Sequence, residues 1–172
     1  MTMSKKNKTR ICIIGMPGSG KSTIGSLLSE KLKYRFIDLD NEIEINTGLK
    51  IKEIFKDMGE DSFRKIETDT LNKLIHKDRI VISTGGGTII KNEEILKKSY
   101  NILLNCKLNE LIKRASRNKN RPLLSSNIES KMKDLFNERK ELYNKIADLK
   151  IEASTNITET IADILSSLEN DY

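Results

Sequence analysis

The chain has 172 residues, of which 37% are hydrophobic and 33% charged, and its formal net charge is +6. This length suits one compact domain, so we expect a single domain over residues 1–172. The sequence contains no apolar stretch near the roughly 20 residues that a membrane helix needs, which argues against a membrane protein. Residues 1–9 are basic and polar, and no signal-peptide core follows them. We therefore expect a flexible tail at 1–9. Cys12 and Cys106 each lie in a predicted strand without a partner motif, which favours buried, reduced thiols and a cytoplasmic protein.

The positive charge suits either nucleic acid or small polyanionic ligands. The 31 Lys and Arg residues are scattered along the chain, Trp is absent, and Phe and Tyr number four each. Aromatic platforms for base stacking are therefore scarce. We expect a small-molecule substrate as the partner, rather than nucleic acid or a membrane, and we expect a monomer.

A phosphate-binding loop follows the first apolar run, Ile11–Ile14. Residues 15–23 read Gly-Met-Pro-Gly-Ser-Gly-Lys-Ser-Thr, which contains the pattern G-x-x-x-x-G-K-[ST]. Glycines let backbone N–H groups wrap a triphosphate, and a helix that begins at Lys21 adds its positive end. Lys21 then reaches the β- and γ-phosphates, and the Ser22 hydroxyl is placed to bind Mg²⁺. We call residues 15–22 the P-loop.

Short β-rich runs alternate with helical periodicity along the rest of the chain, as in a parallel sheet with helices on both faces. We predict strands at 10–14, 35–38, 79–83, 101–105 and 149–153. We predict helices at 21–33, 39–47, 51–57, 60–77, 91–99, 108–117, 129–148 and 157–169. The expected fold class is α/β, with three αβα layers around a five-stranded parallel sheet.

Residues 117–127 interrupt this pattern with a polar, basic loop between two predicted helices. A loop of this length is either a functional lid or a disordered insert. The loop contains Arg117 and Arg121, and Arg114 lies just before it. These arginines favour the first interpretation, a mobile lid that covers the bound phosphates.

Asp38 and Asp40 lie at the end of the second predicted strand. Alternation along a strand puts both carboxylates on one face, and ligands of parallel sheets bind beyond the carboxyl ends of strands. One carboxylate would support Mg²⁺ and the other would accept a hydrogen bond from a substrate hydroxyl. Capping of the next helix is the alternative.

Three successive glycines, Gly85, Gly86 and Gly87, follow the third predicted strand. They either expose bare N–H groups to a ligand or form a flexible turn, and their place at a strand end favours a ligand. Arg139 lies on an otherwise apolar helical stripe, and Arg64 lies at the edge of another. Each guanidinium either extends to solvent or faces a cleft and pairs with an anion.

Taken together, these motifs resemble the shikimate kinase family. The resemblance rests on the P-loop with Thr23, Asp38-x-Asp40, Gly59-Glu60-x-x-Phe63-Arg64-x-x-Glu67, the triple glycine (Gly85–Gly87), Arg121-Pro122-Leu123-Leu124 and Arg139-x-x-x-Tyr143. It spans residues 10 to about 155. It implies a kinase with a lid that uses ATP and Mg²⁺ to phosphorylate the 3-hydroxyl of shikimate, in aromatic amino acid biosynthesis.

The resemblance also implies a role for each site residue. Asp40 would be the catalytic base, Asp38 would help to hold Mg²⁺ with Ser22, and Arg121 would reach the transferring phosphoryl group. The shikimate carboxylate would bind Arg64 and Arg139, beside the triple glycine, and Glu67 would orient Arg64. The implied nucleotide site comprises Gly18, Ser19, Gly20, Lys21, Ser22, Thr23, Arg114, Arg121 and Asn156.

The sequence departs from the family pattern after the last strand, where residues 153–156 read Ala-Ser-Thr-Asn without an arginine or proline. Backbone carbonyls would then hold the adenine at this position. We therefore expect the nucleotide to be ATP and not GTP. A gluconate-type kinase would share the P-loop, but Phe63-Arg64-x-x-Glu67 and residues 121–124 fit shikimate better. A nucleic-acid-stimulated ATPase would need a basic face with stacking aromatics. A homologue without catalysis would have lost Lys21, an aspartate or Arg121, and all are present.

Overall fold

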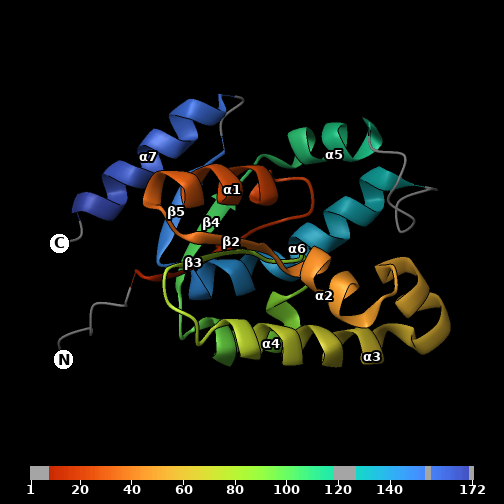
Figure 1. The fold of residues 1–172 in the computed structure, drawn as a ribbon. Helices are drawn as coiled ribbons and strands as arrows, with labels where there is room; N and C mark the ends of the chain where they lie inside the picture. Colours follow the sequence, from red (N-terminus) through yellow and green to blue (C-terminus); the bar gives the residue numbers. More distant parts are fainter. Residues whose placement is uncertain (1–7, 118–126, 154–155, 171–172) are drawn as a thin grey trace.

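The computed structural model describes residues 8–117, 127–153 and 156–170 (Figure 1). The strands are β1 (Arg10–Ile14), β2 (Arg35–Asp38), β3 (Ile80–Ser83), β4 (Tyr100–Asn105) and β5 (Leu149–Glu152). The helices are α1 (Lys21–Leu32), α2 (Leu39–Thr47), α3 (Ile51–Leu74), α4 (Ile89–Leu96), α5 (Leu108–Arg117), α6 (Ile128–Ile146) and α7 (Ile157–Asn170). These bounds confirm each predicted strand to within one residue at either end.

The five strands form one sheet in the order β2-β3-β1-β4-β5, and every pairing is parallel. This arrangement confirms the predicted fold class. The central strand β1 pairs with β3 on one side and β4 on the other, so the chain order reverses at β1. Such a switch point is where ligands bind in open parallel sheets, beyond the carboxyl ends of the strands. The P-loop leaves β1 at this point, and the triple glycine follows β3.

Side chains alternate between two buried cores, one on each face of the sheet. Ile11 and Ile13 of β1 point into the core that is closed by α1 and α7. Cys12 and Ile14 point into the opposite core, which includes side chains of α3, α4 and α6. Alternation along a strand explains this division, because successive side chains point to opposite faces. The result is the predicted three-layer arrangement.

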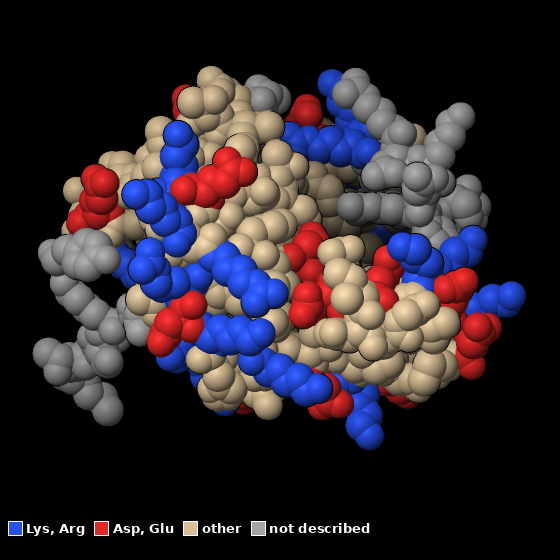
Figure 2. All heavy atoms as spheres, viewed as in Figure 1, with Lys and Arg blue, Asp and Glu red and all other residues tan. Residues whose placement is uncertain are grey.

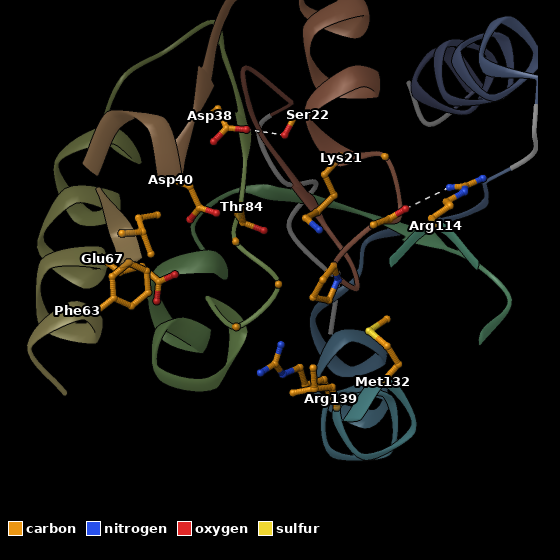
Figure 3. A pocket seen from close by; sticks show the side chains of 18 of the residues that line it. Lys21, Ser22, Asp38, Asp40, Phe63, Glu67, Thr84, Arg114, Met132 and Arg139 are labelled. Carbon is orange, nitrogen blue, oxygen red and sulfur yellow. Dashed lines mark hydrogen bonds between the residues drawn. The ribbon is translucent and has the colours of Figure 1, made fainter. Parts of the chain in front are cut away.

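Helix α3 contains the break that the sequence indicated near residues 58–59. Gly59 has φ 80° and ψ 171°, which is not helical, and the chain turns there between two helical segments. A side chain at this positive φ would be strained, which accounts for a glycine at the bend. The second segment carries Phe63 and Glu67 toward the cleft described below (Figure 3). Arg64 of the same segment also lines that cleft.

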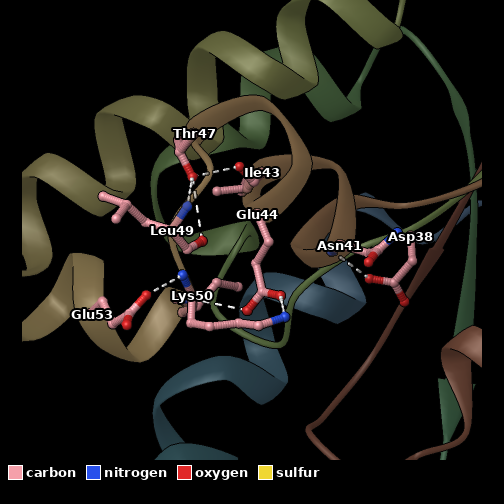
Figure 4. A network of polar contacts seen from close by, with 9 residues as sticks. Asp38, Asn41, Ile43, Glu44, Thr47, Leu49, Lys50 and Glu53 are labelled. Atoms are coloured by element: carbon pink, nitrogen blue, oxygen red, sulfur yellow. Dashed lines mark hydrogen bonds and ion pairs between the residues drawn. The ribbon is translucent and has the colours of Figure 1, made fainter.

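The turn from α2 to α3 is held by a small polar network (Figure 4). Glu44 accepts a hydrogen bond from Lys50 Nζ at 2.7 Å and another from the Ile51 N–H at 3.0 Å. These two donors hold the pKa of Glu44 below its ordinary value. The Lys50 N–H donates to Glu53 Oε2 at 2.7 Å, so the start of α3 is also capped. The network fixes the angle between two helices that both line the cleft.

The first described residues are tied to the fold. Lys8 Nζ donates to the Leu168 carbonyl at 2.5 Å, and Thr9 Oγ1 donates to Asp78 Oδ1 at 3.1 Å. Within the expected tail, residues 8 and 9 are therefore held, and residues 1–7 lie outside the described part. Among the described helices, none has the length and apolar character that crossing a membrane requires. Figure 2 shows acidic side chains interspersed among the basic ones on one face of the molecule.

Candidate active site

A cleft of about 610 Å³ lies beyond the carboxyl ends of β1, β2 and β3 (Figure 3). The P-loop, the start of α2, the triple glycine, α3 and α6 all contribute to its wall. Most of the residues that the sequence singled out line this cleft: Gly18, Gly20, Lys21, Ser22, Thr23, Asp38, Asp40, Arg64, Gly85, Gly86, Gly87, Arg114 and Arg139. The fold thus brings together motifs that are separated by more than a hundred residues.

The P-loop has the shape that the motif predicts. Gly15, Gly18 and Gly20 have φ values of 147°, 84° and 95°, which favour glycine. Lys21 is only 8% exposed, and its ammonium donates to the carbonyls of Gly15 and Met16 at 2.9 and 2.8 Å. A buried cation beside inward-turned backbone N–H groups is a site for a polyanion.

Ser22 and Asp38 meet at the mouth of the P-loop. Ser22 Oγ donates to Asp38 Oδ2 at 2.5 Å and lies 3.2 Å from Ser83 Oγ. The other Asp38 oxygen accepts from the Asn41 N–H at 3.2 Å and so caps α2. The capping alternative is thus correct for Asp38, but the same carboxylate also lines the cleft. Two oxygen donors in contact form a set that suits Mg²⁺.

Asp40 reaches the cleft by a route that the sequence did not predict. β2 ends at Asp38, and Asp40 belongs to the first turn of α2, so strand alternation does not place the two carboxylates on one face. The helical turn instead points Asp40 into the cleft beside the triple glycine (Figure 3). A Cβ atom added to Gly85 would lie 3.0 Å from Asp40 Oδ1, which shows how closely the carboxylate approaches that backbone.

Arg64 is held in the cleft by two acidic side chains of its own helix. Its Nη1 atom donates to Glu67 Oε2 at 2.8 Å, and Nη2 donates to Glu60 Oε1 at 3.3 Å. Glu67 is fully buried, and its second oxygen accepts from Thr88 Oγ1 at 2.7 Å. A buried carboxylate with both oxygens occupied keeps Arg64 in one orientation. The solvent-facing alternative for Arg64 is therefore wrong.

Arg139 projects from α6 into the same cleft (Figure 3). The residue is 8% exposed, and its buried Nε atom has no hydrogen-bond partner among the described residues. The nearest carboxylate, that of Glu138, is 3.9 Å from this atom. A buried guanidinium N–H without a partner is costly, and a bound anion would satisfy it. Arg139 faces the cleft, so the solvent-facing alternative is wrong here too.

The triple glycine is required by close packing. None of the three glycines lies in the left-handed region. A Cβ on Gly86 would lie 2.6 Å from Pro17 Cγ of the P-loop, and one on Gly87 would meet the guanidinium of Arg64. Gly86 and Gly87 do lie in a turn, and each of the three positions fits closely against a side chain of the cleft.

We predict that Gly87→Ala weakens anion binding at Arg64 about tenfold and leaves nucleotide binding unchanged. The added methyl group would displace the guanidinium from its position against the glycine backbone, and one well-placed charged hydrogen bond is worth about 1.5–3 kcal/mol. Calorimetric titration with both ligands measures this. Gly86→Ala is the matched control, because its methyl group meets Pro17 and should affect nucleotide binding instead. Equal effects of both variants on both ligands would contradict this assignment.

Two predicted site residues, Ser19 and Asn156, are not among the described residues that line the cleft, and a third, Arg121, lies outside the described residues. Ser19 lies in the P-loop, but its Oγ atom is buried without a hydrogen-bond partner among the described residues. Asn156 instead caps α7, where its Oδ1 atom accepts from the N–H of Thr158 at 3.1 Å. Arg121 and most of the predicted lid lie outside the described residues. Arg114, which precedes the predicted lid, does line the cleft and donates to the Gly18 carbonyl at 3.2 Å.

The sequence did not predict the apolar part of the cleft wall or one polar side chain that supports it. The apolar part comprises Ile51, Phe55, Phe63, Met132 and Leu135. The polar support is Thr88, which binds Glu67 from directly after the triple glycine. Its position next to a glycine motif was the only signal that could have suggested this role.

Comparison with known proteins identifies the family. A model of the family described as shikimate kinase matches residues 17–169. The chain belongs to the shikimate kinase family. Relatives named shikimate kinase include one from Microcystis aeruginosa, 42% identical over 94% of this chain and 89% of its own. Another, from Sulfurihydrogenibium sp., is 37% identical over 92% of this chain and 97% of its own.

Solved structures agree with this family. A shikimate kinase from Acinetobacter baumannii in complex with shikimate has a TM-score of 0.91 and 36% identity, and the match covers 96% of each chain. A gluconokinase from Sinorhizobium meliloti has a TM-score of 0.64 at 14% identity, over 96% of this chain and 94% of its own, and so shares the fold alone. The resemblance noted from the motifs is confirmed, and this member of the family is a kinase.

Proposed function

We propose that this chain transfers the γ-phosphoryl group of ATP to the 3-hydroxyl of shikimate, which yields ADP and shikimate 3-phosphate. One observation carries the proposal: a single cleft contains the P-loop, the carboxylate of Asp40 and two guanidiniums, those of Arg64 and Arg139. A triphosphate, a ring hydroxyl and a ring carboxylate each match one of these groups. The family and its shikimate-bound structural relative support this choice of acceptor.

In this mechanism the P-loop binds the phosphates and Lys21 supplies positive charge where negative charge develops. Phosphoryl transfer depends mainly on positioning and electrostatic stabilisation. Ser22 and Asp38 would hold Mg²⁺, which neutralises phosphate charge when bound. Their contact at 2.5 Å places both oxygen donors beside the P-loop. Lys21 is already turned toward the loop by its two carbonyl partners.

Asp40 is the proposed base for the attacking hydroxyl. The 3-oxygen of shikimate forms a bond to the γ-phosphorus, the bond from that phosphorus to the β,γ-bridging oxygen breaks, and the hydroxyl proton passes to Asp40. The carboxylate lies against the triple glycine and lines the cleft. This position suits a group that must contact a ring lying on the glycine backbone.

The shikimate carboxylate would bind Arg64 and Arg139, which approach from two different helices. Arg64 is pre-oriented by Glu67 and Thr88, and the buried Nε atom of Arg139 gains the partner that it lacks. Pre-oriented donors reduce the entropy that binding costs. The ring would then lie against the triple glycine and the apolar wall formed by Phe63 and its neighbours.

The family resemblance supports three further contacts with the nucleotide. Arg114 would stack on adenine, and its place in the cleft wall beside Gly18 supports this. Arg121 would reach the transferring phosphoryl group from a lid at about 117–127. Asn156 follows β5, and the backbone next to it would contact the base.

An ADP-release assay with ATP and Mg²⁺ tests the proposed activity. The acceptors to compare are shikimate, quinate, gluconate, nucleoside monophosphates and single-stranded DNA. We expect shikimate to give the highest kcat/KM, because two arginines and one aspartate match its carboxylate and hydroxyls. Equal or faster turnover of gluconate or a nucleotide would overturn the proposal.

A further inference from the structure

Tyr143 contacts both the P-loop and the triple glycine from the side that faces away from the cleft. Its hydroxyl oxygen lies 3.0 Å from the Gly15 carbonyl oxygen, where the P-loop begins, and 2.5 Å from the Gly86 carbonyl oxygen of the triple glycine. Tyr143 is 3% exposed and is absent from the lining of the cleft. It therefore lies behind the cleft wall and contacts the backbone on which each substrate would lie.

The hydroxyl has one hydrogen for two carbonyls. Burial raises the pKa of Tyr143 above its ordinary value, against the opposing effect of the Arg139 guanidinium, which hydrogen-bonds the same hydroxyl, so the phenol keeps its proton. Arg139 carries only donors, so it does not compete for that proton. A phenol donates only one hydrogen bond. The Gly15 carbonyl also accepts from Lys21 Nζ at 2.9 Å, whereas the Gly86 carbonyl makes the shorter contact with Tyr143. In this arrangement the hydroxyl donates to Gly86, and Lys21 supplies the donor for Gly15.

A nucleotide changes this balance at Gly15. Its phosphates compete for the ammonium of Lys21, which in this structure is held by the carbonyls of Gly15 and Met16. As Lys21 turns toward phosphate, the Gly15 carbonyl becomes a better acceptor for the Tyr143 hydrogen. The hydrogen bond to Gly86 then weakens, and the backbone beneath the acceptor ring is altered.

We propose that Tyr143 is a positioning residue whose shared hydroxyl couples nucleotide binding at the P-loop to acceptor binding at the triple glycine. The inference rests on the proposed function for the identity of the two ligands. Arg139 lies one helical turn before Tyr143 on α6. An acceptor carboxylate bound to Arg139 would therefore contact the same helix that carries Tyr143. Coupling of this kind is reciprocal, so each ligand changes the affinity of the other by the same factor.

The test compares Tyr143→Phe with a matched change elsewhere. Tyr100→Phe removes the hydroxyl of another buried tyrosine, at the start of β4 and in the core beneath α1 and α7. Calorimetry gives the Kd of shikimate for each protein, alone and with a saturating non-hydrolysable ATP analogue. One hydrogen bond changes an equilibrium by roughly two- to tenfold. We expect a change of that size on adding the analogue to the wild type and to Tyr100→Phe, and none in Tyr143→Phe.

A merely structural role would lower the Tm of Tyr143→Phe and leave this ratio of affinities unchanged. That result, or a wild-type ratio of one, would overturn the proposal. Hydrogen exchange of residues 84–88 supplies a readout that does not need shikimate. The analogue should change exchange there in the wild type and in Tyr100→Phe, but not in Tyr143→Phe. If the wild type binds no shikimate, the proposed function fails, whereas the exchange result still decides whether Tyr143 links the loops.

Discussion

Lys21→Met should abolish most phosphoryl transfer and leave the fold intact. The ammonium is buried beside the P-loop, and no other described lysine lines the cleft. A donor preorganised for developing negative charge is worth roughly a hundredfold to a thousandfold in kcat. Methionine has a similar length but no charge, so it fills the same space. Steady-state kinetics on the purified variant, together with its circular dichroism spectrum, measures both effects.

Lys31→Met is the matched control for this experiment. Lys31 lies in the last turn of the same helix, α1, and is exposed. The change removes the same charge from the same element at a distance from the P-loop, so kcat should remain near the wild-type value. Activity above one tenth of wild type in Lys21→Met would mean that the P-loop had been assigned incorrectly.

Arg139→Met should weaken shikimate binding by at least about 30-fold and leave ATP affinity nearly unchanged. Loss of one partner from a desolvated charge pair costs about 2–5 kcal/mol, and each 1.4 kcal/mol is about tenfold in Kd. Methionine keeps most of the aliphatic stem, so packing on α6 is preserved. The substitution also removes the hydrogen bond between the guanidinium and the Tyr143 hydroxyl, so the Tm without ligand is measured to separate a loss of stability from a loss of binding. Calorimetric titration with each ligand gives both affinities.

Arg35→Met controls for the loss of one positive charge. Arg35 is exposed at the start of the edge strand β2, far along the chain from the residues of the cleft wall on α6. We expect this variant to bind both ligands like the wild type. An unaltered shikimate affinity in Arg139→Met would show that this guanidinium has no role in binding the acceptor.

The elements of the fold could be predicted closely because their signals are local. The strands were visible as short apolar runs, and the P-loop motif fixes its own conformation through glycines within eight residues. The break at Gly59 was equally local, since it depends on one residue with positive φ. Side-chain direction was harder to predict. The predicted bounds of β2 and α2 are correct, but alternation along a strand cannot place Asp40, because this residue belongs to the helix that follows. The first turn of α2 points its carboxylate into the cleft.

The residues that hold the cleft side chains in position could not be predicted, because their roles depend on contacts between distant parts of the chain. Helical periodicity places Arg64 and Arg139 on particular faces, but only packing shows that both faces border one cleft. Gly87 must lack a side chain because Arg64 lies against it. Tyr143 meets Gly15 across 128 positions of sequence. No pattern within a single element contains that information.

The position of the phosphate on the product tests the central claim most directly. The proposed geometry anchors the shikimate carboxylate on Arg64 and Arg139 and presents one ring hydroxyl to Asp40 and the P-loop. Phosphorus–proton correlation by NMR, on the product of wild-type enzyme with ATP, Mg²⁺ and shikimate, identifies the carbon that bears the phosphate. We predict coupling of phosphorus to the proton on carbon 3 alone. Phosphate on another ring oxygen, or no phosphorylated shikimate at all, would contradict this account.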